Sequence, residues 1–387
     1  MASFGRHGGQ GLPAELLASG GPELAGLRMA VTAGVSVVLA FTIISTWWCL
    51  APLTGGLAFW QRRLRLLLSR RVASLDEDHF ATEKEGEVAE FPSLSALADD
   101  KIVLSVVLLA CDEEARLPVM LDDAIAYLQH RQLTQASFGF EIIVVDNASH
   151  DFTASAATRF VHKYGANVVR ILRLRYRHDD GAAIRKGVLR TRGKYILVAG
   201  AEGFVRLSEY DRLESAMTSL QGEGIVLGSR AHMQLDLRSR GATKVSRMDA
   251  DSGDAGSANP SPADMTSSTL EHRQGQTSQA PSLACEVAWR IFQVIFQMFC
   301  ARDIYDPLCP FQLYSRLAAQ RVFLRERLDT PAATCERLVL ARRFGIPIVE
   351  RAVQWTSLQE CIPPAKISAE CARDTLIMVV LRKLNLW

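Results

Sequence analysis

Beyond residue 100, the hydrophobic positions of the chain form short apolar runs that alternate with stretches of helical spacing. The first run, 102–109, is rich in β-branched residues, which is typical of a strand buried on both faces. The next stretch has apolar residues at Leu117, Leu121 and Leu128, which form one face of a helix. The same pattern predicts strands at 102–109, 141–145, 168–172, 195–199 and 224–227, and helices at 117–131, 152–164, 181–191 and 208–220. This alternation predicts an α/β fold in which helices cover both faces of a mostly parallel sheet.

The loops that follow the predicted strands are the places where a fold of this class binds its ligands. They begin after Leu109, Val145, Leu172 and Ala199. The last of them reads Val-Ala-Gly-Ala-Glu-Gly, an apolar run that carries a single carboxylate, Glu202. The sequence therefore places its candidate chemistry along one edge of the sheet.

The N-terminal part of the chain contains an uncharged run from residue 29 to residue 60. Its best core, 29–50, would rise about 33 Å as a helix, enough to cross the hydrocarbon core of a bilayer. A buried soluble helix and a cleaved signal peptide are the alternatives, but the run is long for either and has no clear basic leader. The arginines that follow the run are Arg62, Arg63, Arg65, Arg70 and Arg71.

Positive charge next to a span is retained on the cytoplasmic side, so these arginines set the expected orientation. We expect a lumenal tail at 1–28 and a transmembrane anchor at 29–52. A basic juxtamembrane segment and linker at 53–100 would follow, and the rest of the chain would be cytosolic. The eight cysteines form no CxxC pair and are widely spaced, which fits reduced thiols in that compartment.

Two later segments depart from the alternation. Residues 238–282 are polar and almost devoid of large apolar side chains, a composition that predicts a disordered insertion. Residues 283–300 include Trp289 and Phe296 and predict a strongly apolar helix. Such a helix belongs either to the core or to the surface of a bilayer. The net charge of +2, together with the absence of basic helices or finger spacings, argues against nucleic acid as a partner.

Four segments in order carry a resemblance to a known family. They are RLPVMLDDAIAYLQHRQ (116–132), GAAIRKG (181–187), GSRAH (228–232) and FGIPIVERAVQW (344–355). With these segments the chain resembles the family 2 glycosyltransferases of the GT-A fold. Within that family it is most similar to the members that transfer glucose from UDP-glucose to dolichyl phosphate at the endoplasmic reticulum membrane.

The resemblance implies roles for particular residues on the donor side. A carboxylate holds the nucleoside of the UDP-sugar, and Asp146, with Glu113 nearby, falls at such a position. Arg185 and Arg230 fall at the positions of cations that would face the phosphates. Residues 101–237 would therefore form the nucleotide-sugar-binding half of the GT-A domain.

The resemblance also implies a metal site and an acceptor site. The Asp-x-Asp pair of the family, which binds Mg²⁺ or Mn²⁺, falls on Gly200-Ala201-Glu202, so that Glu202 is the candidate metal ligand and catalytic residue. Asp306 matches a second catalytic carboxylate on the acceptor side. Residues 283–387 would form an acceptor half with membrane-associated helices. The implied partners are a UDP-sugar, dolichyl phosphate and membrane lipid.

Several loop residues depart from the pattern of the family. Asn147 stands where a second aspartate is usual, and Gly200 stands where the first metal-site aspartate is usual. Asp179 and Asp180 replace a Gly-Lys pair, and either could give a metal at Glu202 a second ligand. Three functions remain open: a glucosyltransferase with an altered site, a catalytically inactive relative that acts as a membrane partner or regulator, and a transferase for another donor such as GDP-mannose.

Overall fold

The computed structural model describes residues 79–82, 88–231, 283–356 and 363–383. These residues leave out the predicted anchor at 29–52, the part of the 53–100 segment that precedes residue 79, and the predicted insertion at 238–282. Within the described ranges, no helix is both long and apolar enough to span a bilayer.

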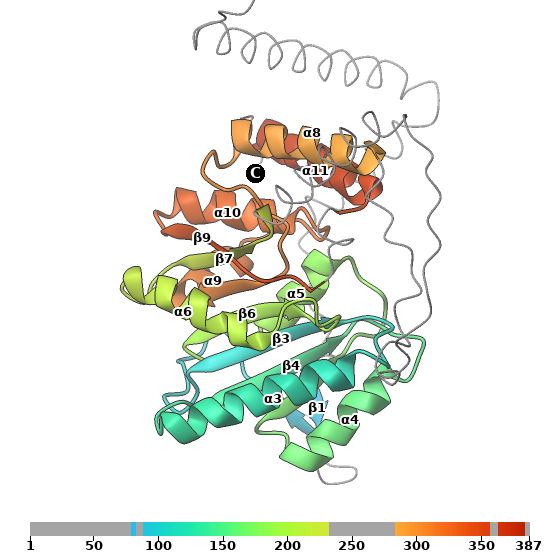
Figure 1. The fold of residues 1–387 in the computed structure, drawn as a ribbon, viewed down its shortest axis with the longest axis vertical. Helices are drawn as coiled ribbons and strands as arrows, with labels where there is room; N and C mark the ends of the chain where they lie inside the picture. The colour runs from blue at the N-terminus through green and yellow to red at the C-terminus, as the bar shows by residue number, and fades with distance from the viewer. Residues whose placement is uncertain (1–78, 83–87, 232–282, 357–362, 384–387) are drawn as a thin grey trace, which may run out of the picture. The chain divides into compact units, whose positions relative to one another are not determined.

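The described strands form a two-stranded ribbon and a larger sheet (Figure 1). The larger sheet has seven strands in the order β5-β4-β3-β6-β8-β7-β9. The strands are β1 (His79–Ala81), β2 (Val88–Glu90), β3 (Leu104–Ala110), β4 (Phe140–Asp146), β5 (Val169–Arg173), β6 (Tyr195–Gly200), β7 (Ile225–Ser229), β8 (Gln312–Ser315) and β9 (Ile348–Ala352). Strands β3 to β7 confirm the five predicted from the sequence.

The sheet is mostly parallel, as predicted. Strand β3 pairs in parallel with β4 and with β6, and β4 pairs in parallel with β5. The exception is β8, which runs antiparallel between β6 and β7. The sequence did not predict β8, because its four residues, Gln-Leu-Tyr-Ser, mix polar and apolar positions and all four are nevertheless buried.

Helices cover both faces of the sheet. They are α3 (Leu117–Thr134), α4 (Thr153–Tyr164), α5 (Asp180–Val188), the 3₁₀ helix η4 (Leu207–Glu209), α6 (Tyr210–Ser219), α8 (Leu283–Phe299), α9 (Arg316–Phe323), α10 (Ala333–Arg343) and α11 (Ala365–Lys383). Helix α5 packs closely on β3 and β4 because Gly187 has no side chain: a Cβ there would lie 2.7 Å from Val107 and 2.5 Å from Val145. This contact holds the last turn of α5 against the two strands.

The segment predicted as a linker contains the ribbon of β1 and β2. The rings of Phe80 and Phe91 contact each other in a tilted arrangement with centroids 4.8 Å apart, and the guanidinium group of Arg170 lies 5.0 Å from the Phe80 ring. These aromatic contacts attach the ribbon to β5, so part of the predicted linker belongs to the folded domain.

The helix predicted at 283–300 is present as α8, which packs lengthwise against α11 at the top of Figure 1. The residues of α8 that are buried in this contact are Trp289, Phe292, Ile295 and Phe296. The rings of Trp289 and Phe292 contact each other in a tilted arrangement with their centroids 5.3 Å apart. Helix α11 in turn contacts α10, which joins this helix pair to the rest of the domain.

Candidate functional site

Hydrogen bonds tie together the loops that follow β3 and β4. The N–H of Asp112 donates to Ser149 Oγ (3.1 Å), and the N–H of His150 donates to Asp112 Oδ1 (2.7 Å). Asp112 and Ala148 have φ angles of 58° and 53°, a conformation that costs energy for residues other than glycine. The carboxyl ends of the two strands therefore form one bonded unit that contains backbone strain, a frequent property of functional sites.

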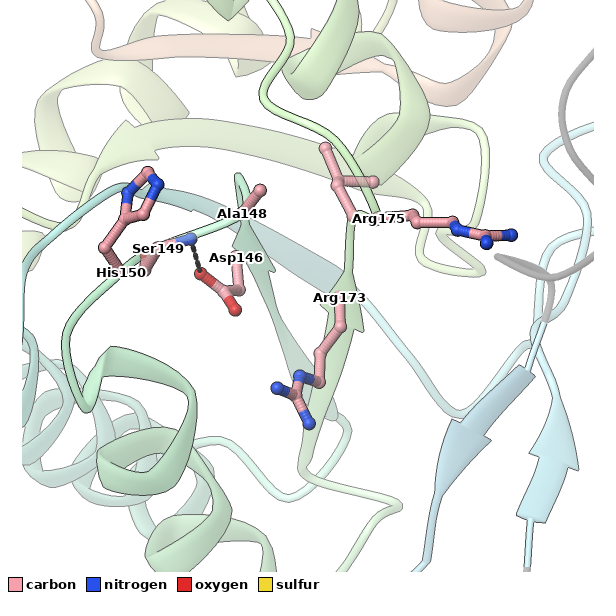
Figure 2. A pocket seen from close by; sticks show the side chains of 7 residues that line it. Asp146, Ala148, Ser149, His150, Arg173 and Arg175 are labelled. Carbon is pink, nitrogen blue, oxygen red and sulfur yellow. Dashed lines mark hydrogen bonds between the residues drawn. The ribbon is translucent and has the colours of Figure 1, made fainter.

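A pocket of about 570 Å³ lies beside these loops (Figure 2), a volume within the usual range for small-molecule sites. It is lined by Asp146, Ala148, Ser149, His150, Arg173, Leu174 and Arg175. Asp146 is buried, and its Oδ1 accepts a hydrogen bond from the N–H of Ser149 (3.1 Å). Arg173 and Arg175 are exposed. The pocket therefore combines a hydrogen-bond acceptor with two solvated cations, which suits an anionic ligand that also carries hydrogen-bond donors.

Asn147 lies next to the pocket and is 2% exposed. Its Nδ2 donates to the carbonyl of His178 (2.8 Å), and its Oδ1 accepts from the N–H of the same residue (2.8 Å). An ionised aspartate has no donor and could make only the second of these bonds. The departure from aspartate thus has a local purpose: the amide fixes the segment that leads from β5 to α5.

Glu202 lies just beyond β6, and its side chain folds back over Gly200. A Cβ at Gly200 would lie 1.8 Å from Glu202 Oε2. Burial raises the pKa of the Glu202 carboxyl above its ordinary value of 4.5. The negative charges of Glu113 and Asp180 raise this pKa further, against the opposing effects of the Glu202 backbone N–H and of Arg116. A cation bound next to this carboxylate would therefore stabilise its ionised form.

Asp180 is the first residue of α5, and its charge acts on Glu202. Burial of its carboxyl group and the charge of Asp179 raise the pKa of Asp180 above its usual 3.8, and Arg177 opposes this. Within the described part of the chain, no three His, Cys, Asp or Glu side chains are arranged to enclose a metal ion. Mg²⁺ in nucleotide enzymes is commonly held by one or two carboxylates together with substrate phosphates. Glu202 fits that arrangement, and a cage made by the protein alone does not fit.

Glu113 follows β3 and is 6% exposed. Both of its carboxylate oxygens accept hydrogen bonds from Arg116, at 2.6 and 2.7 Å. The Arg116 guanidinium also lies 5.7 Å from the ring of Phe204, which stacks on Trp355 with centroids 5.2 Å apart. Glu113 is therefore part of an ion pair that supports an aromatic wall next to Glu202.

The other end of this wall is a buried ion pair. Arg230 donates from Nε and Nη2 to the two carboxylate oxygens of Asp306, both at 2.8 Å, and its backbone N–H donates to Asp306 Oδ2 (2.9 Å). The side chains are 4% and 0% exposed. The Arg230 guanidinium lies 4.9 Å from the ring of Trp355, and the Asp306 N–H donates to Glu350 Oε1 (2.9 Å). Two residues that the sequence assigned to separate roles, phosphate binding and the acceptor, thus form a single unit.

Arg185 has a different environment from the one expected for a phosphate ligand. It projects from α5 toward the segment before α10, where its Nη2 donates to Asp329 Oδ1 (2.8 Å) and its Nη1 to the carbonyl of Glu326 (3.3 Å). The side chain is 17% exposed. Its guanidinium therefore holds α5 against this segment.

The structure thus divides the predicted site residues into groups. Asp146 lines the open pocket, whereas Glu113 lies near enough to Glu202 to raise the pKa of the Glu202 carboxyl. Arg230 and Asp306 are paired, and Arg185 is paired with Asp329.

The sequence reasoning missed Arg173, Arg175, Trp355 and Glu350. The two arginines alternate with apolar residues, a pattern typical of the edge of a strand, so it gave no sign of a binding role. Strands β4 and β5 end together, since Asp146 pairs with Arg173. Sequence positions beyond the end of a predicted strand could therefore have indicated the arginines.

Comparisons with known proteins agree on one family. The model of glycosyl transferase family 2 matches residues 105–252. A dolichyl-phosphate β-glucosyltransferase of Dictyostelium discoideum is 30% identical over 316 residues, which cover 80% of this chain and 85% of the relative. The Homo sapiens protein of the same name is 31% identical over 288 residues, covering 73% and 76% of the two chains.

Among solved structures, glucosyl-3-phosphoglycerate synthase of M. tuberculosis matches with a TM-score of 0.43 and 15% identity. The match covers 73% of this chain and 80% of that chain.

Proposed function

Because the chain belongs to the dolichyl-phosphate β-glucosyltransferases of glycosyltransferase family 2, we propose that it transfers glucose from UDP-glucose to dolichyl phosphate. The observation that carries the proposal is that the pocket around Asp146 and the end of β6 lie at the same edge of the sheet. Only β3 separates the two, since its residues pair with Asp146 on one side and with Gly200 on the other.

In the proposed donor complex, Asp146 accepts hydrogen bonds from the nucleoside of UDP-glucose. Arg173 and Arg175 add positive charge at the same pocket. Glu202 would hold Mg²⁺ or Mn²⁺ together with the diphosphate oxygens. When bound, the metal supplies positive charge to the leaving diphosphate.

The transfer itself requires little proton chemistry from the protein. An oxygen of the acceptor phosphate attacks C1 of glucose, the bond from C1 to the diphosphate oxygen breaks, and UDP leaves with the electron pair. A phosphate monoester is largely ionised at neutral pH, so its oxygen needs no general base. The protein's contribution is to position the two anions and to offset their charge.

This chemistry suggests a positioning role for Asp306. Both of its carboxylate oxygens accept hydrogen bonds from Arg230, and its side chain has no exposed surface. Asp306 is therefore poorly placed to take a proton from an acceptor. We propose that Asp306 fixes the Arg230 guanidinium against Trp355.

A lipid acceptor requires contact with a membrane, and α8 offers a suitable face. The large apolar side chains of α8 that remain exposed are Leu283, Val287, Ile291, Val294, Met298 and Phe299. Their spacing of three and four residues places the first five along one stripe of the helix, opposite the face that packs on α11. Such a stripe is typical of helices that lie in the plane of a bilayer surface. We propose that α8 contacts the lipid from which dolichyl phosphate is drawn.

The proposed location follows from the sequence. The apolar run at 29–50 would anchor the chain in the endoplasmic reticulum membrane, and the arginines after it would keep the catalytic part in the cytosol. UDP-glucose is then bound on the cytosolic face, where the lipid phosphate accepts the sugar.

A direct assay tests the proposal. Membranes that contain the full chain are incubated with labelled UDP-glucose, dolichyl phosphate and Mn²⁺, and the lipid fraction is analysed for dolichyl-phosphate glucose. We expect product with the unaltered chain, and at least about a hundredfold less with Asp146→Asn and with Glu202→Gln. Glu223→Gln, at an exposed acid far from the edge, is the matched control and should leave the rate unchanged.

Two outcomes would contradict the proposal. Equal transfer from labelled GDP-mannose would show that the pocket does not select uridine. Absence of labelled lipid with any donor, while the protein remains folded and membrane-bound, would favour a catalytically inactive partner or regulator.

A further inference from the structure

Strand β6 ends in a glycine that makes room for a side chain rather than for a backbone conformation. Gly200 lies within the strand and outside the left-handed region of φ, so its backbone conformation is open to other residues. A Cβ at this position would lie 1.8 Å from Oε2 and 2.8 Å from Cδ of Glu202. Both distances are shorter than 3.0 Å, the limit below which Cβ contacts essentially do not occur. The observed position of the Glu202 carboxylate therefore requires glycine at residue 200.

The carboxylate lies at the border of a small cavity. Gly200, Glu202, Phe204 and Trp355 are among its lining residues, and its volume of about 10 Å³ is close to that of one water-sized probe. Trp355 is 6% exposed, and among the described residues no hydrogen-bond partner faces its Nε1. Buried polar atoms normally have partners, so an unpaired N–H on a residue that lines the same cavity as Glu202 indicates a place where a polar ligand completes the site.

We propose that Gly200 is a positioning residue whose missing side chain lets the Glu202 carboxylate serve the donor in place of an aspartate at residue 200. The inference rests on the proposed function, because it assumes that Glu202 acts on the metal-bound diphosphate. On this view, glycine at the first position and glutamate at the second are one coupled change. Glutamate has one methylene more than aspartate, and the extra length allows its carboxylate to reach back over the strand end.

The coupling gives specific consequences for substitutions. In Gly200→Ala, the new Cβ displaces the far end of a flexible side chain, so the fold should persist while the carboxylate moves. In the double variant Gly200→Asp with Glu202→Ala, the new carboxylate begins from a Cβ that is 1.8 Å from the present Oε2 site. It therefore enters the same region of space from the other residue.

The experiment measures UDP binding to the purified full chain in detergent by calorimetry, with and without Mn²⁺. Electron paramagnetic resonance of Mn²⁺ in the presence of UDP gives a second readout. We expect Gly200→Ala and Glu202→Gln each to weaken the Mn²⁺-dependent part of UDP binding by about 10–100-fold. The double variant should recover most of this loss. Thermal unfolding of each variant checks that the fold is intact.

The results separate failure of this inference from failure of the proposed function. Unchanged Mn²⁺ dependence in Gly200→Ala, with loss in Glu202→Gln, would overturn the positioning role and leave the donor site standing. Loss in both single variants without recovery in the double variant would show that a carboxylate at residue 200 cannot replace the one at residue 202, and would overturn the idea of one coupled change. Failure of the unaltered chain to bind UDP would overturn the proposed function itself.

Discussion

The two carboxylates that the sequence proposed as catalytic, Glu202 and Asp306, have opposite surroundings. Asp306 accepts three hydrogen bonds from Arg230 and has no exposed surface. Glu202 faces other acids, and burial together with the charge of Glu113 raises its pKa. One carboxylate is already neutralised by the protein, whereas no cation among the described residues makes a comparable contact with the other.

This difference indicates which carboxylate is organised for a ligand. A buried ion pair contributes to a defined structure, and removing one partner leaves the other charge without compensation. The ionised form of a carboxylate is unfavourable near other carboxylates and is stabilised when a cation binds. Groups with such shifted pKa values are frequent at ligand sites. The surroundings of the Arg230–Asp306 pair therefore favour a structural role, and those of Glu202 favour the binding of a cation.

The largest expected effect is on the acceptor side. In Asp306→Ala, Arg230 would keep its buried charge without its main partner, so the free energy of unfolding should fall by about 3–5 kcal/mol. Denaturant unfolding of the full chain in detergent measures the loss. Glu202→Gln is the comparison and should change stability by less than about 0.5 kcal/mol. Equal stability of the two variants would remove the contrast between the two carboxylates.

A smaller effect is expected at the amide beside the donor pocket. Asn147→Asp removes the donor to the His178 carbonyl and places a carboxylate at a site that is 2% exposed, so stability should fall by about 1–3 kcal/mol. UDP binding should weaken as well, because the segment that carries Arg175 loses its attachment. Asn167→Asp, at an exposed position, is the matched control. An unchanged UDP affinity in Asn147→Asp would mean that this segment does not shape the pocket.

The exposed apolar stripe of α8, which we propose contacts lipid, gives a prediction for the use of dolichyl phosphate alone. Ile291 is 47% exposed, so Ile291→Glu should leave folding and UDP binding unchanged. The charge opposes insertion into the bilayer surface, and the KM for dolichyl phosphate in liposomes should rise by about tenfold or more. Leu133→Glu, on the exposed side of α3, provides the control for an added charge. A matching rise in KM for that control would indicate a general effect of surface charge.

Much of the fold could be predicted because strands β3 to β7 are buried on both faces, and such strands appear in sequence as continuous apolar runs. Strand β8 could not, since it carries polar side chains at buried positions. Ser315 Oγ accepts a hydrogen bond from the N–H of Gly224, which is distant in the chain, and Gln312 donates to the carbonyl of Cys309 just before the strand. The ribbon of β1 and β2 was missed for a similar reason. Its attachment depends on Phe80 and Phe91 meeting arginines of the later chain.

The site was predictable as an edge but not as a set of contacts. The sequence placed Asp146 and Glu202 at the ends of two predicted strands, and the structure has both strands, with β3 between them. It could not show that Arg230 and Asp306, 76 positions apart, are one ion pair. It also could not show that Gly200 and Glu202 share space, since this depends on the rotamer of one side chain. Pairings of this kind arise from tertiary packing, for which a single sequence has no local signal.

The smallest expected effect concerns the charge on Glu202. Burial and the charges of Glu113 and Asp180 raise its pKa, so without metal its ionised form is disfavoured in the fold. The stability that its neutral form contributes is fully present below about pH 4.5 and is lost as the pH rises through the raised pKa. Mn²⁺ needs the ionised form, so Mn²⁺-dependent UDP affinity should fall on the acid side at a pH above that of an ordinary glutamate. Removing one neighbouring charge in Asp180→Asn should shift this limb to lower pH, and Asp179→Asn should shift it less. Superimposed pH profiles of the unaltered chain and Asp180→Asn would show that the charge of Asp180 does not act on Glu202, and the contrast with Asp306 would then rest on the Arg230 ion pair alone.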